Sequence, residues 1–279
     1  MSNNSTLKPR PYWHVDAKWI AGLLLVPFLG ATLLAYNLVQ LTAEEPAIES
    51  LSLVLALLLS EGGLDDQAEI IKFQQQLESS PGGSLQPIPG LRVTIDKDEL
   101  AGFSPREARM AFFRKFAEPI YAGGAEGLAA LANDPQMRAQ ILEGGGMLNL
   151  FTLQNHQQLQ RGFLVLGVIT LFLFIPLIFF SYRFGRLGSP TCVLFAASLP
   201  GAILFGFLST LGLQAQATPP PREAGVTALA GYIASNILPQ LAQAFSRTYL
   251  ILLAASLVLL LVALIGSFGS RASLKENQL

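Results

Sequence analysis

Side chains that could bind a metal are sparse in this sequence. Asp96, Asp98 and Glu99 alternate as calcium ligands do, but the segment lacks the glycine and the distal glutamate of an EF-hand loop. A solvated turn is therefore the favoured interpretation of this segment. The two histidines, His14 and His156, fall on opposite sides of the membrane in the topology derived below, so they are not expected to share a metal ion.

Side chains for covalent or redox chemistry are equally few. The single cysteine, Cys192, cannot form an internal disulfide and lies in an apolar run, where we expect it to pack as a small hydrophobic side chain. The sequence contains no Gly-x-Ser-x-Gly, His-Glu-x-x-His, phosphate-loop or Cys-x-x-Cys motif. We expect neither an enzyme nor a bound cofactor, and an active site of a new type in residues 42–160 stays open as the alternative.

The composition is typical of a protein that resides in a lipid bilayer. Only 13% of the 279 residues are charged and 51% are hydrophobic, whereas soluble domains carry roughly 25% charged residues. The net charge of −1 gives no long-range attraction for nucleic acid. The expected partners are the lipid bilayer and other membrane subunits or a second copy of the chain, and nucleic acid is not expected.

Four uncharged runs are long enough to cross the hydrocarbon core, which takes about 20 apolar residues in a helix. The predicted fold class is an all-α integral membrane protein with four transmembrane helices and a mainly helical extracytoplasmic domain between the first and the second. The predicted segments are an N-terminal tail (1–18), a first span (19–41), the extracytoplasmic domain (42–160), a second span (162–182), a cytoplasmic link (183–189), a third span (190–213), an extracytoplasmic loop with an amphipathic helix (214–247), a fourth span (248–268) and a C-terminal tail (269–279).

Basic residues near the ends of the spans predict the orientation. They gather in the N-terminal tail, the link and the C-terminal tail, at Lys8, Arg10, Lys18, Arg183, Arg186, Arg271 and Lys275. Because cytoplasmic flanks carry the excess of Lys and Arg, both termini are predicted to be cytoplasmic, in a plasma or inner membrane. The other side carries Arg161, Arg222 and Arg247, so the asymmetry is incomplete. Aromatic side chains near the predicted interfaces are Trp13, Trp19, Tyr36, Tyr182 and Tyr249.

The predicted outer domain contains clear helix signals. Ser104, Pro105 and Glu107 form a helix start with a capping box, and the Gly123-Gly124 pair interrupts the helix that follows. Asp134-Pro135 makes another start. The short apolar run 51–59 predicts a buried or interfacial helix, or a continuation of the first span, and 91–95 a short strand. The glycines at 144–146 predict a turn, with a hinge as the alternative, and residues 147–160 a helical extension of the second span.

The loop 214–247 carries an apolar stripe at helical spacing. The stripe comprises Val226, Leu229, Ile233, Ile237, Leu241 and Phe245. The opposite face carries almost no positive charge for lipid headgroups, so we expect this helix to pack on the outer domain, with the membrane surface as the alternative.

The interiors of the spans contain no Asp, Glu, Lys, Arg or His, but they do contain residues that affect how helices pack. Ser198, Ala202, Gly206 and Thr210 recur at four-residue spacing and form a stripe of small residues, which lets another helix approach closely. The stripe predicts contact with the chain's own spans, or alternatively with a partner. Pro27, Pro176 and Pro200 are candidate kinks. Asn37 is the most polar side chain in a span and is expected near the interface.

Two functional hypotheses follow. The first is a non-catalytic polytopic membrane subunit that acts in assembly, scaffolding or partner contact through its extracytoplasmic domain. The alternative is a transporter or channel component with a path along kinked helices, gated by the outer domain. The absence of Asp, Glu, Lys, Arg and His from the interiors of the four spans favours the first hypothesis, because pumps and carriers place such groups on their pathways.

Overall fold

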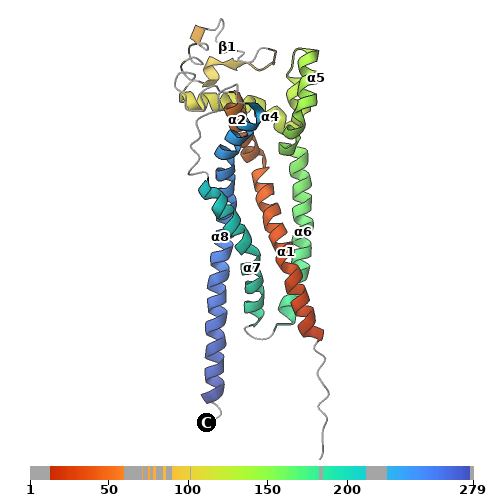
Figure 1. The fold of residues 1–279 in the computed structure, drawn as a ribbon, viewed down its shortest axis with the longest axis vertical. Helices are drawn as coiled ribbons and strands as arrows, with labels where there is room; N and C mark the ends of the chain where they lie inside the picture. Colours follow the sequence, from red (N-terminus) through yellow and green to blue (C-terminus); the bar gives the residue numbers. More distant parts are fainter. Residues whose placement is uncertain are drawn as a thin grey trace, which may run out of the picture. The chain divides into compact units, whose positions relative to one another are not determined.

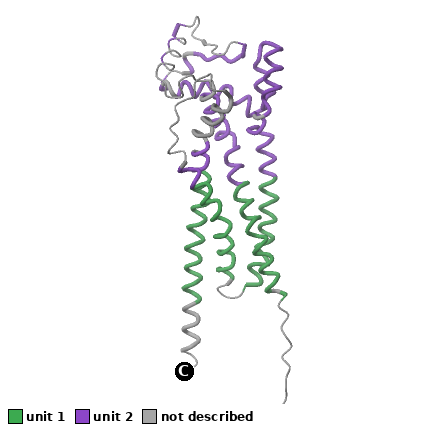
Figure 2. The backbone as a smooth tube through the Cα atoms, viewed as in Figure 1, with its two compact units in different colours: residues 1–35, 162–206, 244–279 green, residues 36–161, 207–243 purple. Residues whose placement is uncertain are grey.

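The computed structural model describes residues 13–59, 71, 75, 78–79, 84–85, 90–100, 102–181, 185–211 and 225–276. This part of the chain is mainly helical (Figure 1). Its elements are α1 (Trp13–Leu41), α2 (Glu44–Leu59), β1 (Ser84–Leu85), β2 (Ile95–Asp96), η1 (Lys97–Leu100), α4 (Pro105–Ala130), α5 (Pro135–Gly144), η2 (Gly145–Phe151), α6 (Leu153–Phe179), α7 (Gly185–Leu211) and α8 (Gly225–Glu276). The chain forms two compact units: unit 1 comprises residues 1–35, 162–206 and 244–279, and unit 2 comprises residues 36–161 and 207–243 (Figure 2).

Four of the described helices are long and apolar enough to span a membrane. These stretches are Val15–Leu41, Leu153–Phe179, Arg186–Thr210 and Leu241–Ser267. In the most apolar window of the second and of the fourth, only 11% of the residues are buried within the protein. Their apolar side chains therefore face outward, where hydrocarbon is the favourable solvent and water is not. This confirms the prediction of a multi-pass membrane protein in contact with lipid.

Several helices are longer than the predicted spans. Helix α1 begins at Trp13, before the predicted start at residue 19, and α6 begins at Leu153, before residue 162. Helix α8 runs without interruption from Gly225 to Glu276, so the amphipathic helix and the fourth span are one helix and not two. The reason is local, because no glycine or proline between residues 240 and 265 supplies a helix end. Of the predicted apolar stripe, Phe245 is buried, whereas the side chains at 226–237 lie outside the described ones.

The core of unit 1 joins α1, α6 and α7. Leu25 and Leu29 of α1 pack with Leu177 of α6 and with Val193 and Ala197 of α7. A hydroxyl pair adds a polar link between α1 and α6, where the Oγ1 atoms of Thr32 and Thr170 lie 2.9 Å apart. Because the Thr32 hydroxyl already donates to the carbonyl oxygen of Phe28, Thr170 is the donor of this pair.

The helix contacts within unit 1 define which ends lie together. Gly22 and Gly30 of α1 lie against Val193 and Ala197 of α7, so these two helices run in the same direction. Helices α6 and α8 run the opposite way, because Trp13 of α1 contacts Phe180 and Gly188 of α7 faces Ala263. The starts of α1 and α7 therefore share one end of unit 1 with the ends of α6 and α8.

Aromatic rings pack α7 against α8. The ring of Phe205 meets that of Phe245 edge-on at 5.0 Å and stacks on that of Tyr249 at 5.5 Å. The Tyr249 ring lies against Gly201, where any side chain would overlap the ring. Tyr249 is buried in this contact, and its place in an interfacial aromatic belt stays a prediction. Trp13 and Trp19 are exposed, as a belt requires.

Unit 2 is built on the packing of α2 against α4. Ile48 and Leu51 of α2 pack with Ala117, Ile120 and Tyr121 of α4, which confirms a buried helix at 51–59. A second cluster contains Ala56, Leu91, Val93, Ile95, Ala108, Phe112, Phe113 and Phe116. The predicted strand at 91–95 forms only in part: β2 pairs antiparallel with β1, with Ile95 opposite Leu85, and Leu91 makes an isolated bridge to Ala132.

The predicted helix starts of unit 2 are confirmed atom by atom. Ser104 Oγ accepts from the Glu107 N–H at 3.4 Å, and Glu107 Oε2 accepts from the Ser104 N–H at 2.7 Å. Hydrogen bonds that the Ser104 side chain and the Ser104 backbone N–H make to the Glu107 carboxyl lower the pKa of Glu107. At the start of α5, Asp134 Oδ1 accepts from the Gln136 N–H at 3.0 Å.

The predicted interruption of α4 falls at Gly124. Its backbone has φ 60° and ψ −134°, a conformation that only glycine adopts without strain. Three residues later, the backbone of Gly127 lies against the Pro119 carbonyl group, and a side chain at Gly127 would overlap the Pro119 oxygen. The break therefore brings the second half of α4 back onto the first half.

This packing predicts opposite effects of two neighbouring substitutions. Gly127→Ala forces a methyl group into the Pro119 carbonyl and should destabilise the protein by about 1–3 kcal/mol, as overpacking does. The matched change Gly123→Ala places its methyl where no atom lies within 4 Å. It should leave stability unchanged or raise it by up to about 1 kcal/mol, because alanine favours the helix. Thermal unfolding of the detergent-solubilised protein, followed by circular dichroism, measures both. Equal melting temperatures for the two variants would contradict the close approach at Gly127.

Candidate functional site

Unit 2 contains a polar cavity of about 640 Å³ beside the break in α4. We call it the amide groove. It is lined by Ala122, Gly123, Ala125 and Glu126 of α4, Leu142 of α5, Asn149 of η2, Thr152, and Gln154, Asn155 and Gln158 of α6. Its size lies within the roughly 300–1,000 Å³ typical of ligand sites.

The floor of the amide groove is made by the broken helix. Beyond Gly124 the helix restarts, and the buried N–H of Ala125 has no carbonyl of its own helix to bond. Asn149 Oδ1 accepts this N–H at 3.2 Å. A side chain at position 124 would overlap that oxygen, so Gly124 is required twice, for its φ and for the approach of Asn149.

One wall of the amide groove is the start of α6, and Thr152 sets it. The Thr152 hydroxyl donates to the Asn149 carbonyl oxygen at 2.9 Å and accepts from the Asn155 N–H at 3.3 Å. It thereby ends η2 and caps α6. Gln154 and Gln158 follow on one face of α6, a single turn apart, and both are exposed.

The carboxamide side chains of the groove suit polar groups that carry no charge. The carboxylate of Glu126, also in the lining, suits a single cationic group. Each carboxamide can both donate and accept hydrogen bonds. Among the described residues that line the groove, Glu126 alone is charged, and it is exposed. Apolar side chains stand nearby in the chain, with Leu142 in the lining and Leu150 and Leu153 exposed beside it.

A network of hydrogen bonds joins α4 and α6 to the residue that follows α1. Thr42, just after α1, donates from Oγ1 to the Leu38 carbonyl oxygen at 2.8 Å and lies 3.0 Å from Nδ1 of His156. The imidazole therefore donates to the Thr42 hydroxyl. Tyr121 of α4 donates its hydroxyl to the Thr42 carbonyl oxygen at 3.3 Å. Burial, with a smaller effect of the Glu44 charge, raises the pKa of Tyr121.

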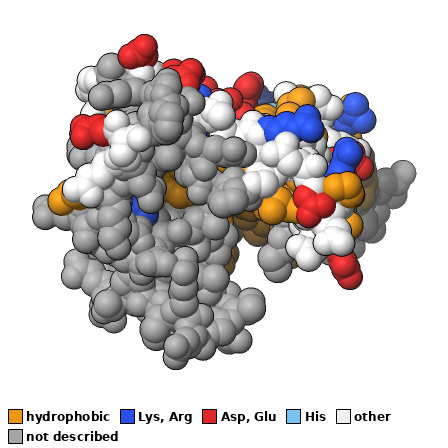
Figure 3. All heavy atoms as spheres, turned by 90° about the horizontal axis from the view of Figure 1, so that it is seen from above, with side chains coloured by type: hydrophobic (Ala, Val, Ile, Leu, Met, Phe, Trp, Pro, Cys, Tyr) orange, Lys and Arg blue, Asp and Glu red, His pale blue; other side chains and the backbone are white. Residues whose placement is uncertain are grey.

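Arg114 and Lys115 of α4 form surface ion pairs outside the groove. Arg114 binds Glu45 at 2.9 Å and Glu118 at 3.2 Å, which raises its pKa. Lys115 pairs with Glu99, whose pKa is lowered by that hydrogen bond, and it also donates to the Thr94 carbonyl oxygen at 3.1 Å. All of these groups are exposed enough for water to screen the pairs. Figure 3 shows side chains of both signs on one face.

Among the residues that the structure describes, no group of three His, Cys, Asp or Glu side chains is arranged to hold a metal ion. The acidic segment Asp96, Asp98 and Glu99 lies at the end of β2 and in η1.

The small-residue stripe of α7 divides along its length. Ser198 and Ala202 are buried, and Ser198 Oγ donates to the Leu194 carbonyl oxygen at 2.8 Å. Gly206 is half-buried, and Thr210 is exposed with its hydroxyl bonded to the Phe207 carbonyl oxygen at 2.7 Å. The first two positions thus pack inside the protein, and docking of a partner on the stripe stays a prediction.

The candidate kinks lie inside continuous helices, Pro27 in α1, Pro176 in α6 and Pro200 in α7. Bending at these prolines and a path along them stay predictions. Asn37 is buried in unit 2, and its place near the membrane interface stays a prediction. Cys192 is exposed on α7, and not packed among other side chains as its apolar neighbours suggested.

Sequence reasoning missed the amide groove. It identified 147–160 as an unbroken helical extension, whereas η2 ends at Phe151 and α6 begins at Leu153. The available signal was the polar run before the second span, which holds four glutamines and two asparagines between residues 149 and 160 beside the glycines at 123–124 and 144–146.

No family model, no curated protein and no solved structure matches this chain.

The contact between Asn149 and Ala125 predicts a site-specific change in amide exchange. Asn149→Ala leaves the buried Ala125 N–H without its acceptor and should cost about 1 kcal/mol, as loss of a helix cap does. Asn149→Asp keeps the acceptor and adds a charge that favours the helix start. Hydrogen–deuterium exchange should show faster exchange at residues 124–128 in Asn149→Ala and protection in Asn149→Asp. Loss of protection in both variants would show that the side-chain oxygen is not the cap.

Proposed function

We propose that this chain is a non-catalytic membrane protein that holds a polypeptide partner in the amide groove of unit 2. The observation that carries the proposal is the row of carboxamides on α6, opposite the broken helix α4, in a cavity of about 640 Å³. This assigns the expected role in assembly or partner contact to particular residues.

A peptide backbone suits the groove because it presents the same groups as the groove itself. An extended polypeptide offers alternating N–H donors and C=O acceptors. Gln154 and Gln158 each offer a donor and an acceptor, one helical turn apart. The aromatic platforms on which sugar rings stack are missing from the lining residues, so a peptide is favoured over a carbohydrate.

The remaining lining groups suggest the partner's sequence. Glu126 favours a Lys, Arg or terminal amine at one position of the bound segment. Leu142, which lines the groove, favours an apolar side chain at another position, and Leu150 and Leu153 are exposed nearby in the chain.

The proposed topology places unit 2 outside the cytoplasm, in a plasma or inner membrane. Lys18 and Arg186 lie near the starts of α1 and α7, and Arg271 lies near the end of α8. The contacts within unit 1 bring these three helix ends to one end of that unit. By the positive-inside rule this end is cytoplasmic, which supports cytoplasmic termini.

Site-specific photocrosslinking tests the groove. A photoreactive benzoylphenylalanine at Gln158 lines the groove, whereas one at Gln160 lies on the opposite face of the same helix. The expected result in intact cells is a discrete polypeptide adduct from position 158 and none from 160.

The crosslinked segment, made as a synthetic peptide, should bind the full chain in nanodiscs. The double change Gln154→Ala and Gln158→Ala should weaken this binding about tenfold or more, since two hydrogen bonds are lost.

The matched control for binding is Gln160→Ala, which removes an exposed carboxamide of the same helix outside the groove. It should leave the affinity for the peptide unchanged. Equal adducts from both faces, or adducts with lipid alone, would refute a peptide site in the amide groove.

Thiol labelling tests the topology separately. In a Cys192→Ser background, a cysteine at exposed Arg138 of α5 should react with a membrane-impermeant maleimide on intact cells. A cysteine at Lys275, near the end of α8, should react only after permeabilisation. The reverse pattern would invert the proposed orientation.

A further inference from the structure

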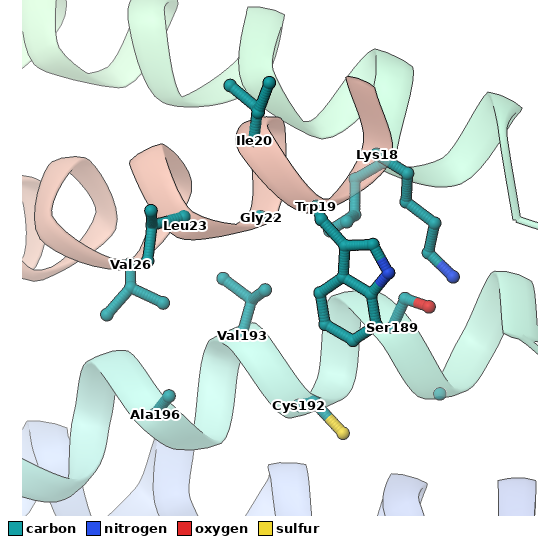
Figure 4. A pocket seen from close by; sticks show the side chains of 12 residues that line it. Lys18, Trp19, Ile20, Gly22, Leu23, Val26, Ser189, Cys192, Val193 and Ala196 are labelled. Atoms are coloured by element: carbon teal, nitrogen blue, oxygen red, sulfur yellow. The ribbon is translucent and has the colours of Figure 1, made fainter. Parts of the chain in front are cut away.

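Unit 1 contains a second cavity, of about 620 Å³, which we call the α1–α7 groove (Figure 4). It is lined by Lys18, Trp19, Ile20, Gly22, Leu23 and Val26 of α1, Leu177 of α6, and Gly188, Ser189, Cys192, Val193 and Ala196 of α7. Both α1 and α7 are long and apolar enough to span a membrane, so lipid and not water is expected to surround the groove.

Several of the residues that line the groove are small. Gly22 on α1 and Gly188, Cys192 and Ala196 on α7 do not fill the space that larger side chains would occupy. The atoms that line an empty groove have no partner atoms on one side, so they lose the dispersion energy of those contacts. The space is therefore expected to be filled by a molecule that the bilayer supplies.

The groove is polar at one end only. Lys18 and Ser189 lie at that end in Figure 4, and the hydrophobic side chains of Val26 and Ala196 lie at the other. The Lys18 ammonium nitrogen is 5.9 Å from the centre of the Trp19 ring, which stands over the groove with 70% of its surface exposed.

Further positive charge is adjacent. Arg186 is exposed one turn before Ser189 on α7, outside the lining, and its Nε donates to the Ser181 carbonyl oxygen at 3.1 Å. The acid nearest to the groove along α1 is Asp16, which is exposed one turn before Trp19 and Ile20 and is not itself a lining residue. The groove thus offers an ammonium, a hydroxyl and a nearby guanidinium at its mouth, followed by a purely apolar channel.

We propose that the α1–α7 groove binds one anionic glycerophospholipid of the bilayer. One acyl chain lies along Leu23, Val26 and Val193, and the phosphate lies between Lys18 and Ser189. Charge complementarity selects this occupant, because basic sites between membrane helices at the cytoplasmic surface bind anionic headgroups. A helix of a partner or a second copy of the chain would have to bury the Lys18 charge without a phosphate to neutralise it.

Fluorescence quenching tests this assignment, with Trp19 as the reporter. The chain has two tryptophans, and Trp13→Phe preserves an aromatic contact with Phe180 while leaving Trp19 as the only indole. The full-length protein is reconstituted in phosphatidylcholine vesicles that contain a minor fraction of phosphatidylglycerol. In one preparation the phosphatidylglycerol is brominated near the glycerol end of an acyl chain, and in the other an equal fraction of phosphatidylcholine is. Brominated phosphatidylglycerol should quench Trp19 about fivefold more than its mole fraction predicts, as expected for one basic residue near the surface.

Three variants separate the groove from general attraction of anionic lipid to basic residues. Lys18→Gln removes the charge and should bring quenching by the two lipids to equality. Cys192→Phe fills the groove and leaves the charge in place, and it should also abolish the preference. Arg161→Gln removes an exposed cation of α6 outside the groove, and the preference should persist.

The proposal is overturned if brominated phosphatidylglycerol and phosphatidylcholine quench Trp19 equally in the native sequence. It is also overturned if neither lipid quenches, which would show that protein covers the groove. Persistence of the preference in Lys18→Gln would likewise overturn it. Because Lys18→Gln changes only an interfacial side chain, the test remains decisive even if Cys192→Phe fails to fold.

Discussion

Hydrocarbon as the surrounding solvent is the constraint on which this structure depends. In lipid a backbone or hydroxyl group has no water to bond, so it must find its partner within the protein. The hydroxyls of the spanning helices obey this rule: Thr191 and Ser198 donate to carbonyl oxygens four residues earlier, and Thr32 does the same while accepting from Thr170. Apolar contacts and the close approach of helices at small residues therefore hold unit 1 together.

Much of unit 2 lies outside the four stretches that are long and apolar enough to span a membrane, and its helix α4 breaks at Gly124. The interruption at Gly124 leaves a backbone N–H at Ala125 that a side chain, Asn149, must satisfy. Thr152 performs a similar task between η2 and α6. The same residues that repair the backbone at these breaks also line the amide groove, so the groove is a consequence of the breaks and of the polar side chains they require.

The two grooves differ because their surroundings differ. The amide groove offers paired donors and acceptors, which discriminate among polar ligands through the cost of leaving a buried polar group without a partner. The α1–α7 groove offers shape and a single charge at its mouth, which select by headgroup charge and accommodate any acyl chain. In both, glycines and alanines create the space and a few polar side chains determine what can fill it.

The sequence by itself determined much of what depends on neighbours within about one helical turn. It identified the four spans, the capping box at Ser104 and Glu107, the start at Asp134 and the interruption at Gly123-Gly124. Tertiary structure decided what depends on distant partners. Asn149 meets Ala125 from 24 residues away and His156 meets Thr42 from 114, while Tyr249 is buried by α7. Local propensity is encoded in adjacent residues, whereas a groove exists only once packing has chosen which surfaces meet and which polar groups remain between them.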